Sequence, residues 1–247
     1  MNRFYLQMHI TDRCHGKCKH CYQESHGPND MDYRPAIFMM KELSFMCLQA
    51  GVQSEVAIVG GDPLLHEHFR LITSAAACFC DKVYILGNPE HVNEELIQFL
   101  KPLKIGYYQL SLDGGEETHD KLRYRGSYQK TIRAAMMLKA NGIKVAIKGT
   151  ISDINRSEMG EIALASHQVG ADVLSFDDCI EEGSECNEGP HCSLGKATLT
   201  VLPDLTLMAC RRKASSVLGK WSVDNGLEQN FTTNPKMIAY RLIRRIR

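Results

Sequence analysis

Strand-like and helix-like segments alternate throughout the first 176 residues of the chain. Each short run rich in β-branched and aromatic residues is followed by a longer amphipathic stretch, and glycines such as Gly51 and Gly142 lie where such stretches end. A strand recurs about every 29 residues, the length of one βαβ unit, which predicts a parallel sheet with right-handed crossovers. The predicted strands are 4–10, 55–59, 82–86, 105–112, 143–151 and 173–176, and the predicted helices are 33–50, 66–80, 92–100, 128–140 and 158–169.

The number of these units limits the architecture. Six βα units are too few for the eight of a complete TIM barrel, whereas an open doubly wound sheet and a partial barrel both remain allowed. We predict an α/β protein whose residues 1–176 form a partial (β/α)6 TIM-like barrel, followed by a short cysteine-rich C-terminal extension over 177–247. In both architectures the ligands bind at the carboxyl ends of the strands.

The composition excludes several classes of protein. The 29 Lys and Arg residues balance the 29 Asp and Glu residues, so no overall basic field attracts nucleic acid or membranes. The apolar runs are too short to span a bilayer, and the first residues do not resemble a secretory signal. We therefore expect a cytoplasmic protein without nucleic-acid or membrane partners. In that compartment the ten cysteines are expected to serve metal binding or thiol chemistry rather than disulfides.

Three of these cysteines, Cys14, Cys18 and Cys21, lie within eight residues just after the first predicted strand. One tight loop can direct all three thiolates inward, which suits zinc or an iron–sulfur cluster. A structural zinc site needs a fourth ligand, and His15 and His20 are each adjacent to a cysteine in sequence, which makes a tetrahedron harder to form. The pattern favours a cluster with one open iron, and structural zinc and free thiols are the alternatives.

The spacing of these cysteines, followed by the aromatic Tyr22, resembles the radical S-adenosylmethionine (radical SAM) superfamily. The resemblance extends over residues 3–176 and is strengthened at two other strand ends. The segment 60–63, Gly-Gly-Asp-Pro, follows the second strand and is similar to the family's Gly-Gly-Glu-Pro turn, with Asp in place of Glu. The segment 111–114, Ser-Leu-Asp-Gly, follows the fourth strand and resembles a segment of the peptide-modifying branch.

The resemblance implies a set of cofactor contacts. Cys14, Cys18 and Cys21 would bind a [4Fe-4S] cluster whose fourth iron is chelated by SAM, and reductive cleavage of SAM would give a 5′-deoxyadenosyl radical that abstracts hydrogen from a C–H bond. The implied SAM contacts are Tyr22 near the adenine, Gly60, Gly61, Asp62 and Pro63 around the methionine end, Ser111 and Asp113 on the ribose or substrate side, and Lys148 near the SAM carboxylate or the substrate. Arg123 and Arg125 are expected on the exposed surface, and binding of the SAM carboxylate or of an acidic substrate is the alternative.

The extension contains four further cysteines and two short predicted strands, 197–202 and 206–209, which form a hairpin. It resembles the start of a SPASM or twitch extension, which implies an auxiliary [4Fe-4S] cluster held by Cys179, Cys186, Cys192 and Cys210. Zinc at the same four residues, or one of them left free as a hydrogen-atom donor, are the alternatives. A basic amphipathic helix is predicted over 236–247.

The resemblance to peptide maturases predicts a radical SAM enzyme that modifies a ribosomally made peptide or a protein side chain. The reactions expected are epimerisation, thioether or carbon–carbon crosslinking, or oxidation, with a flavodoxin or ferredoxin as electron donor. The first strand begins near residue 3, so no separate leader-binding domain is expected before it, which weakens the peptide hypothesis. The alternative enzyme is a radical SAM dehydrogenase of a sugar or nucleotide, and the non-enzyme alternative is an iron–sulfur electron-transfer module.

Overall fold

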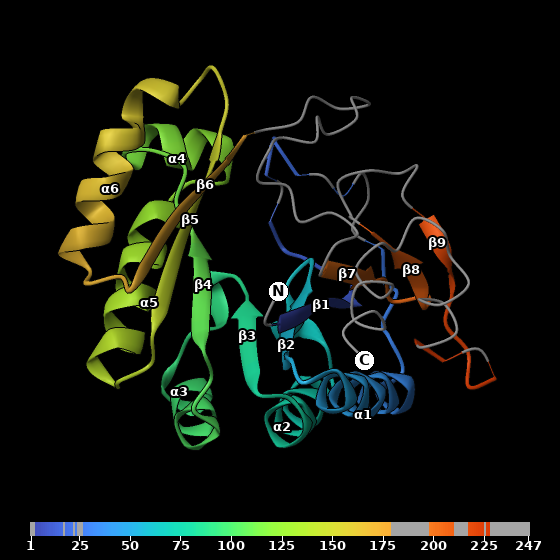
Figure 1. Cartoon of the computed structure of the whole chain (residues 1–247). Helices are drawn as coiled ribbons and strands as arrows, with labels where there is room; N and C mark the ends of the chain where they lie inside the picture. The colour runs from blue at the N-terminus through green and yellow to red at the C-terminus, as the bar shows by residue number, and fades with distance from the viewer. Residues whose placement is uncertain are drawn as a thin grey trace. The chain divides into compact units, whose positions relative to one another are not determined.

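The computed structural model of the chain describes residues 3–16, 18–21, 23, 27–178, 198–209, 217–224 and 226–227. These residues belong to two compact units, whose elements are labelled in Figure 1. The first unit contains the described residues of 3–13, 27–83 and 198–227, and the second contains those of 14–23 and 84–178. The predicted division into a domain over 1–176 and an extension over 177–247 stays a prediction.

The first unit contains both the first strand of the chain and the strands that follow the predicted barrel. Strand β1 pairs in parallel with β2 on one side and with β7 on the other, and β7, β8 and β9 continue as antiparallel neighbours. The predicted hairpin is confirmed as β7 and β8, whereas its pairing with β1 was not predicted. The strands are β1 (Arg3–Thr11), β2 (Gln53–Gly60), β7 (Thr198–Val201), β8 (Thr206–Met208) and β9 (Val217–Lys220).

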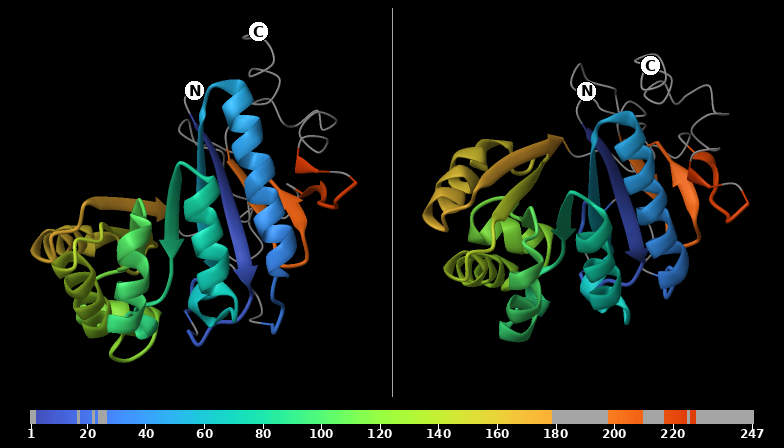
Figure 2. Two further views of the ribbon diagram at one scale, coloured as in Figure 1. Left: turned by 90° about the horizontal axis from the view of Figure 1, so that it is seen from below. Right: turned by 60° about the horizontal axis from the view of Figure 1, so that its bottom comes forward.

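Two helices of the first unit, α1 (Tyr33–Ala50) and α2 (Phe69–Phe79), lie side by side on one face of β1 and β2 (Figures 1 and 2). Helix α1 has the bounds predicted from the sequence. The Asp32 side chain caps its start by accepting the Arg34 N–H at 2.9 Å, and Gly51 ends it with φ +65°, a conformation that glycine adopts without strain.

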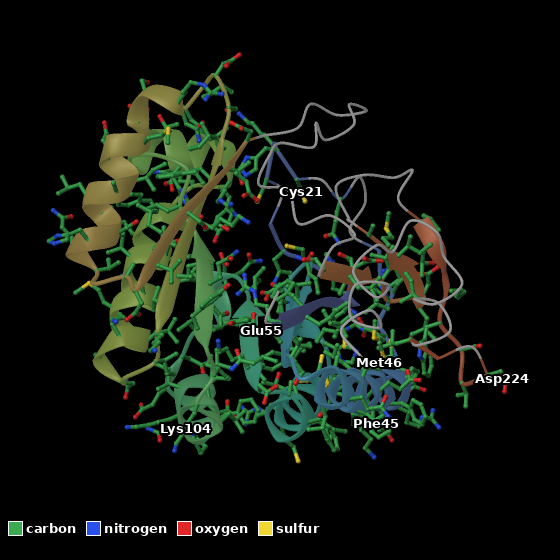
Figure 3. All side chains as sticks on the ribbon, viewed as in Figure 1. Cys21, Phe45, Met46, Glu55, Lys104 and Asp224 are labelled. Carbon is green, nitrogen blue, oxygen red and sulfur yellow. The ribbon has the colours of Figure 1, made fainter. Side chains whose placement is uncertain are left out.

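The core of the first unit lies between these helices and the strands. Leu6, Met8 and Ile10 of β1 are fully buried, and Met39 and Leu43 supply the buried face of α1. Strand β2 is buried along almost its whole length, as expected for an interior parallel strand. The opposite side of α1 is exposed: Phe45, labelled in Figure 3, is 59% exposed.

The second unit contains a parallel sheet in the order β6-β5-β4-β3. Its strands are β3 (Lys82–Leu86, from Tyr84 onward), β4 (Tyr107–Ser111), β5 (Val145–Ile151) and β6 (Val173–Asp178). Its helices are α3 (Glu94–Leu100), α4 (Glu116–Leu122), α5 (Ser127–Ala140) and α6 (Met159–Gln168). Short 3-10 helices complete the two units: η1 (Pro63–Leu65) in the first, and η2 (Pro89–His91), η3 (Lys101–Leu103) and η4 (Arg156–Glu158) in the second.

All six strands predicted for the barrel region are present, with parallel pairing in each unit, so the α/β class is confirmed. Helix α4 was missed, because its seven residues, EETHDKL, carry no apolar period. Among the helices of the described residues, none is both long enough and apolar enough to cross a membrane.

Candidate active site

Hydrogen bonds at the end of β1 tie down the segment that leads into residues 14–21, here called the cysteine loop. Thr11 Oγ1 donates to Asp30 Oδ1 at 2.6 Å, and the Asp12 N–H donates to the Asn29 carbonyl at 2.9 Å. The returning chain therefore lies antiparallel to the end of β1, where it forms an isolated bridge. The point from which the cysteine loop departs is fixed by these bonds.

The glycine pair after β2 packs directly on the same end of β1. The Gly61 N–H donates to the Thr11 carbonyl at 2.9 Å. A Cβ atom on Gly60 would lie 2.5 Å from the Thr11 oxygen, and one on Gly61 would lie 2.8 Å from both the Asp12 oxygen and the Arg13 carbonyl carbon. Backbone packing therefore explains the need for glycine at both positions, and their contact with SAM stays a prediction.

Asp62 and Pro63 continue this turn into η1. The Asp62 N–H donates to the Arg13 carbonyl at 2.7 Å, and its buried side chain accepts the Leu64 N–H at 3.2 Å. Asp62 is thus the N-cap of η1, with Pro63 at the first helical position. Their predicted SAM contacts likewise remain untested.

Hydrogen-bond donors point at the sulfur of Cys14. The Gly16 N–H lies 3.3 Å from Cys14 Sγ, and the Asn88 Nδ2 amide lies 3.4 Å from the same atom. A Cβ atom on Gly16 would lie 3.4 Å from Cys14 Sγ and 3.5 Å from Cys18 Sγ, so these two sulfur atoms flank the glycine. All three cysteines of the loop, Cys21 included (Figure 3), are free thiols and partly exposed.

This donor set fits an iron–sulfur cluster. Three thiols from one loop, with two N–H donors at the Cys14 sulfur, suit a group whose thiolate ligands carry negative charge. Each cysteine of such a cluster binds a different iron, so the sulfur atoms do not need to converge on one point. Within the described residues, no group of three or more His, Cys, Asp and Glu side chains is arranged to hold a single metal ion.

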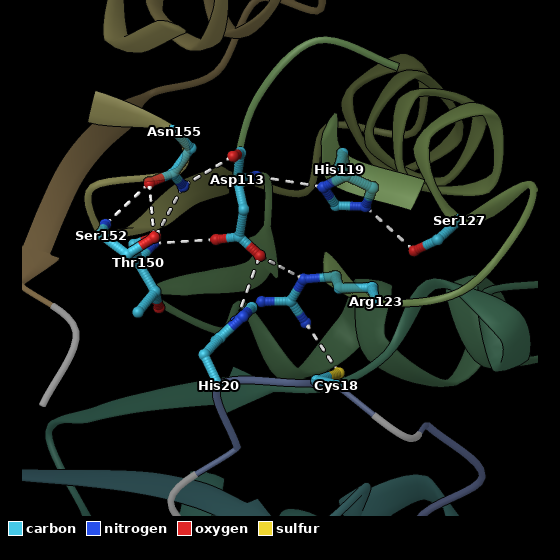
Figure 4. A network of polar contacts seen from close by, with 9 residues as sticks. All are labelled: Cys18, His20, Asp113, His119, Arg123, Ser127, Thr150, Ser152 and Asn155. Atoms are coloured by element: carbon cyan, nitrogen blue, oxygen red, sulfur yellow. Dashed lines mark hydrogen bonds and ion pairs between the residues drawn. The ribbon is translucent and has the colours of Figure 1, made fainter. Parts of the chain in front are cut away.

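Arg123 connects the cysteine loop to Asp113, the second residue after the end of β4 (Figure 4). Its Nε donates to Asp113 Oδ2 at 2.5 Å, and its Nη1 donates to Cys18 Sγ at 3.7 Å. His20, between two of the cysteines, places Nε2 3.3 Å from the same carboxylate oxygen. The Thr150 N–H donates to the other oxygen of Asp113 at 2.8 Å, so both oxygens have partners within the protein.

Two buried side chains hold the Asp113 backbone in place. Asn155 Nδ2 donates to the Asp113 carbonyl at 2.7 Å and to the Thr150 carbonyl at 2.8 Å. His119 Nδ1 accepts the Asp113 N–H at 3.0 Å, so its Nε2 carries the proton and donates to Ser127 Oγ at 2.9 Å (Figure 4). The backbone of Asp113 is therefore held at both its N–H and its carbonyl group.

The network sets the charge states of its members. Burial raises the pKa of the Asp113 carboxyl, but the Arg123 charge, the contact from His20 and the Thr150 N–H outweigh it and hold that pKa well below its ordinary range. Burial, with a contribution from Arg123, lowers the pKa of His119 to about 4. Burial raises the pKa of the Cys18 thiol, and Arg123 opposes that rise. Near neutral pH, Asp113 is ionised and His119 is neutral.

Ser111 and Lys148 are directly paired neighbours on β4 and β5. Lys148 Nζ lies 2.6 Å from Asp177 Oδ2 at the end of β6, so its ammonium already has an acidic partner. Roles for Ser111, Asp113 and Lys148 in binding SAM or substrate stay predictions. Tyr22, Cys179, Cys186, Cys192 and Cys210 lie outside the described residues.

The expectation that Arg123 lies on the exposed surface is wrong, whereas Arg125 is exposed as expected. Only 14% of the Arg123 side chain is exposed, because the guanidinium turns inward onto Asp113. The sequence signal for this ion pair is an arginine, Arg123, ten positions after Asp113, an acidic residue that follows a predicted strand. That signal is weak, because the intervening helix α4 was not predicted.

The sequence matches the radical SAM superfamily over residues 8–164, more than half of the chain. That stretch includes the cysteine loop, the glycine turn after β2 and the Asp113–Arg123 pair. The chain therefore belongs to the radical SAM superfamily, and the predicted enzyme class is confirmed at this level.

Two curated relatives show how far the similarity extends. The antilisterial bacteriocin subtilosin biosynthesis protein AlbA of Bacillus subtilis (strain 168) is 29% identical over 185 residues, which cover 71% of this chain and 40% of AlbA. This chain thus spans about two fifths of that relative's length. The S-adenosylmethionine-dependent nucleotide dehydratase of Thermoplasmatales archaeon (strain ISO4-H5) is 23% identical over 257 residues, which cover 96% of this chain and 87% of that protein.

The fold is also found in a solved structure. Streptococcus suis SuiB bound to S-adenosylmethionine matches 97% of this chain and 68% of SuiB, with a TM-score of 0.79 and 14% sequence identity. SuiB has also been crystallised with its precursor peptide SuiA. At this identity the match establishes the fold alone, and it confirms the predicted partial-barrel class.

Proposed function

We propose that this chain is a radical SAM enzyme that modifies a ribosomally synthesised peptide or a protein side chain. Cys14, Cys18 and Cys21 would bind the [4Fe-4S] cluster to which SAM is chelated. The observation that carries the proposal is the position of the three thiols: they share one loop after β1, within the stretch that matches the superfamily.

When bound, the cluster and SAM supply a one-electron cleavage that yields a 5′-deoxyadenosyl radical able to take hydrogen from a C–H bond. The chain's own residues position and protect this chemistry. Gly16 and Asn88 donate to the Cys14 sulfur, and Arg123 donates to that of Cys18. The bonds of Thr11 and Asp12 to the returning chain hold the base of the cysteine loop.

A peptide substrate is supported by AlbA, whose name places it in the biosynthesis of a bacteriocin, and by the SuiB fold, which holds a precursor peptide. The reactions that we propose are epimerisation, thioether or carbon–carbon crosslinking, or oxidation. We further propose one auxiliary [4Fe-4S] cluster at Cys179, Cys186, Cys192 and Cys210, and a flavodoxin or ferredoxin as electron donor.

A nucleotide is the second candidate substrate. The specific observation in its favour is the match to the nucleotide dehydratase, which extends over 96% of this chain and 87% of that protein, against 40% of AlbA. This candidate keeps the same cluster and SAM chemistry and changes only the molecule from which hydrogen is taken.

The cluster assignment is tested on protein reconstituted without oxygen. Iron, sulfide and 5′-deoxyadenosine are measured with SAM and dithionite, in the wild type and in a Cys14→Ala, Cys18→Ala, Cys21→Ala variant. We expect about eight irons in the wild type and about four in the variant, with 5′-deoxyadenosine formed only by the wild type. Zinc in place of iron, or iron without SAM cleavage, would refute the radical SAM activity and leave an electron-transfer or structural role.

The substrate class is tested by hydrogen transfer. The wild type is incubated with SAM and dithionite, with either short peptides encoded beside its gene or the common nucleoside triphosphates, all made in deuterated form. Deuterium in 5′-deoxyadenosine with a peptide supports the peptide substrate. Deuterium only with a nucleotide overturns it and favours the second candidate.

A further inference from the structure

Arg123 contacts a cysteine of the loop as well as its acidic partner, and an ion pair with a purely structural role does not require that second contact. One nitrogen, Nε, is engaged by Asp113 Oδ2 at 2.5 Å, and a second, Nη1, is directed to Cys18 Sγ at 3.7 Å. The planar guanidinium thus has one edge on a carboxylate and the other on a cysteine sulfur. Lysine does not reproduce this arrangement, because all its donors are on one nitrogen, whereas these contacts come from two nitrogens of a rigid plane.

The burial of this pair distinguishes it from a surface salt bridge. Asp113 is fully buried, and 14% of the Arg123 side chain is exposed, so solvent screens their charges much less than those of an exposed pair. Thr150 fixes the carboxylate, and the Lys19 N–H donates to the Leu122 carbonyl at 2.9 Å, next to Arg123 in the chain. Backbone and side-chain contacts therefore hold the cysteine loop and the guanidinium together.

We propose that Arg123 is a positioning residue for the cluster, and that its hydrogen bond to the Cys18 sulfur raises the reduction potential of that cluster. The inference rests on the proposed function, because it requires Cys18 to be a cluster ligand. Hydrogen bonds to cluster sulfurs and nearby net charge are both determinants of the potential. A positive donor at a ligand sulfur favours the reduced, more negative state, and the carboxylate of Asp113 opposes it.

The two charges should therefore act in opposite directions when they are removed one at a time. Arg123→Gln removes the positive donor and should make the cluster harder to reduce. Asp113→Asn removes the negative charge and should make the cluster easier to reduce. Damage to the local structure alone gives no reason for shifts of opposite sign, so the sign of each shift separates an electrostatic role from a structural one.

The experiment is an anaerobic redox titration of the reconstituted full chain. The EPR signal followed against potential is that of the reduced cluster at Cys14, Cys18 and Cys21, identified as the signal that the Cys14→Ala, Cys18→Ala, Cys21→Ala variant lacks. We expect Arg123→Gln to lower the ratio of reduced to oxidised cluster about tenfold at a fixed potential, which is about 59 mV for a one-electron couple. Arg123→Lys should recover part of that loss, because it keeps the charge. Arg125→Gln, the same change at an exposed position two residues away, is the matched control and should titrate like the wild type.

An Arg123→Gln midpoint equal to that of the wild type, or a shift shared equally by Arg125→Gln, would overturn the inference. If Arg123→Gln does not retain its cluster, Asp113→Asn decides: a higher potential supports the inference, and an unchanged or lower one refutes it. If the wild type itself binds no cluster, the proposed function has failed, which the iron count shows before any titration.

Discussion

The end of β1 has no space for a side chain on the turn that follows β2, and Gly61→Ala is the sharpest test of that packing. The new methyl group would lie 2.8 Å from the Asp12 oxygen and from the Arg13 carbonyl carbon, whereas ordinary contacts begin at 3.4 Å. Both neighbours are backbone atoms, so relief requires the chain before Cys14 to move. Overpacking of this kind costs about 1–3 kcal/mol of unfolding free energy.

The measurement is urea unfolding of iron-free protein, followed by far-ultraviolet circular dichroism, so that cluster loss does not contribute. For a denaturant slope of about 2 kcal/mol per molar, we expect the midpoint to fall by about 1 M. Loaded Gly61→Ala should also form 5′-deoxyadenosine about 10- to 100-fold more slowly, since the displaced segment leads directly into Cys14.

Gly160→Ala is the matched control, because a Cβ atom on that residue of α6 meets nothing within 4 Å. This change should stabilise the protein by up to about 1 kcal/mol, the usual gain from glycine to alanine in a helix. If Gly61→Ala unfolds at the same urea concentration as the wild type, the contacts described for the glycine turn do not constrain the chain.

Three further substitutions test other parts of the structure. Asn155→Ala should lower the unfolding free energy by about 2–3 kcal/mol in urea titrations, because it leaves the buried Asp113 carbonyl without its amide donor. His119 has a pKa of about 4 in the folded chain, below its unfolded value, so its stabilising effect is complete above about pH 6.5 and is lost as the pH falls toward 4. Between pH 7 and pH 5 the free energy of unfolding of the wild type should thus fall by roughly 2 kcal/mol more than that of His119→Gln, as measured by urea titrations at the two pH values. Equal decreases in the two proteins would contradict this account. Glu42→Ala removes the acceptor of the Trp221 indole N–H, 2.8 Å away, and should shift the emission of this single tryptophan to longer wavelength; unchanged emission would count against that contact.

The sequence was sufficient to predict the elements whose signals are local. Helix α1 begins after the capping residue Asp32 and ends at Gly51, and both signals can be read from neighbouring residues. The three cysteines and the segments after β2 and β4 could be placed at strand ends from the sequence, because their motifs are defined by residue spacing alone and require no knowledge of packing.

Contacts between residues that are distant in the sequence could not be predicted in this way. Nothing local shows that Arg123 turns inward, since its partners lie ten and 105 positions away along the chain. The hydrogen bonds of Asp113 to Thr150 and Arg123 could not be predicted either, because they depend on how β4, β5 and the segment after α4 pack together. The pairing of β7 with β1 joins residues nearly 200 positions apart, and short strands carry no signal that names their partner.

That last pairing has a practical consequence for anyone who shortens the protein. A chain ended at residue 176, as a minimal catalytic core, would lack β7, and one flank of β1 in the first unit would carry unpaired N–H and C=O groups. An unpaired strand edge of this kind can form β-sheet hydrogen bonds with other chains, so the shortened protein should self-associate or precipitate. The strand that leads into the cysteine loop therefore depends on a segment that is synthesised nearly 200 residues later in the chain.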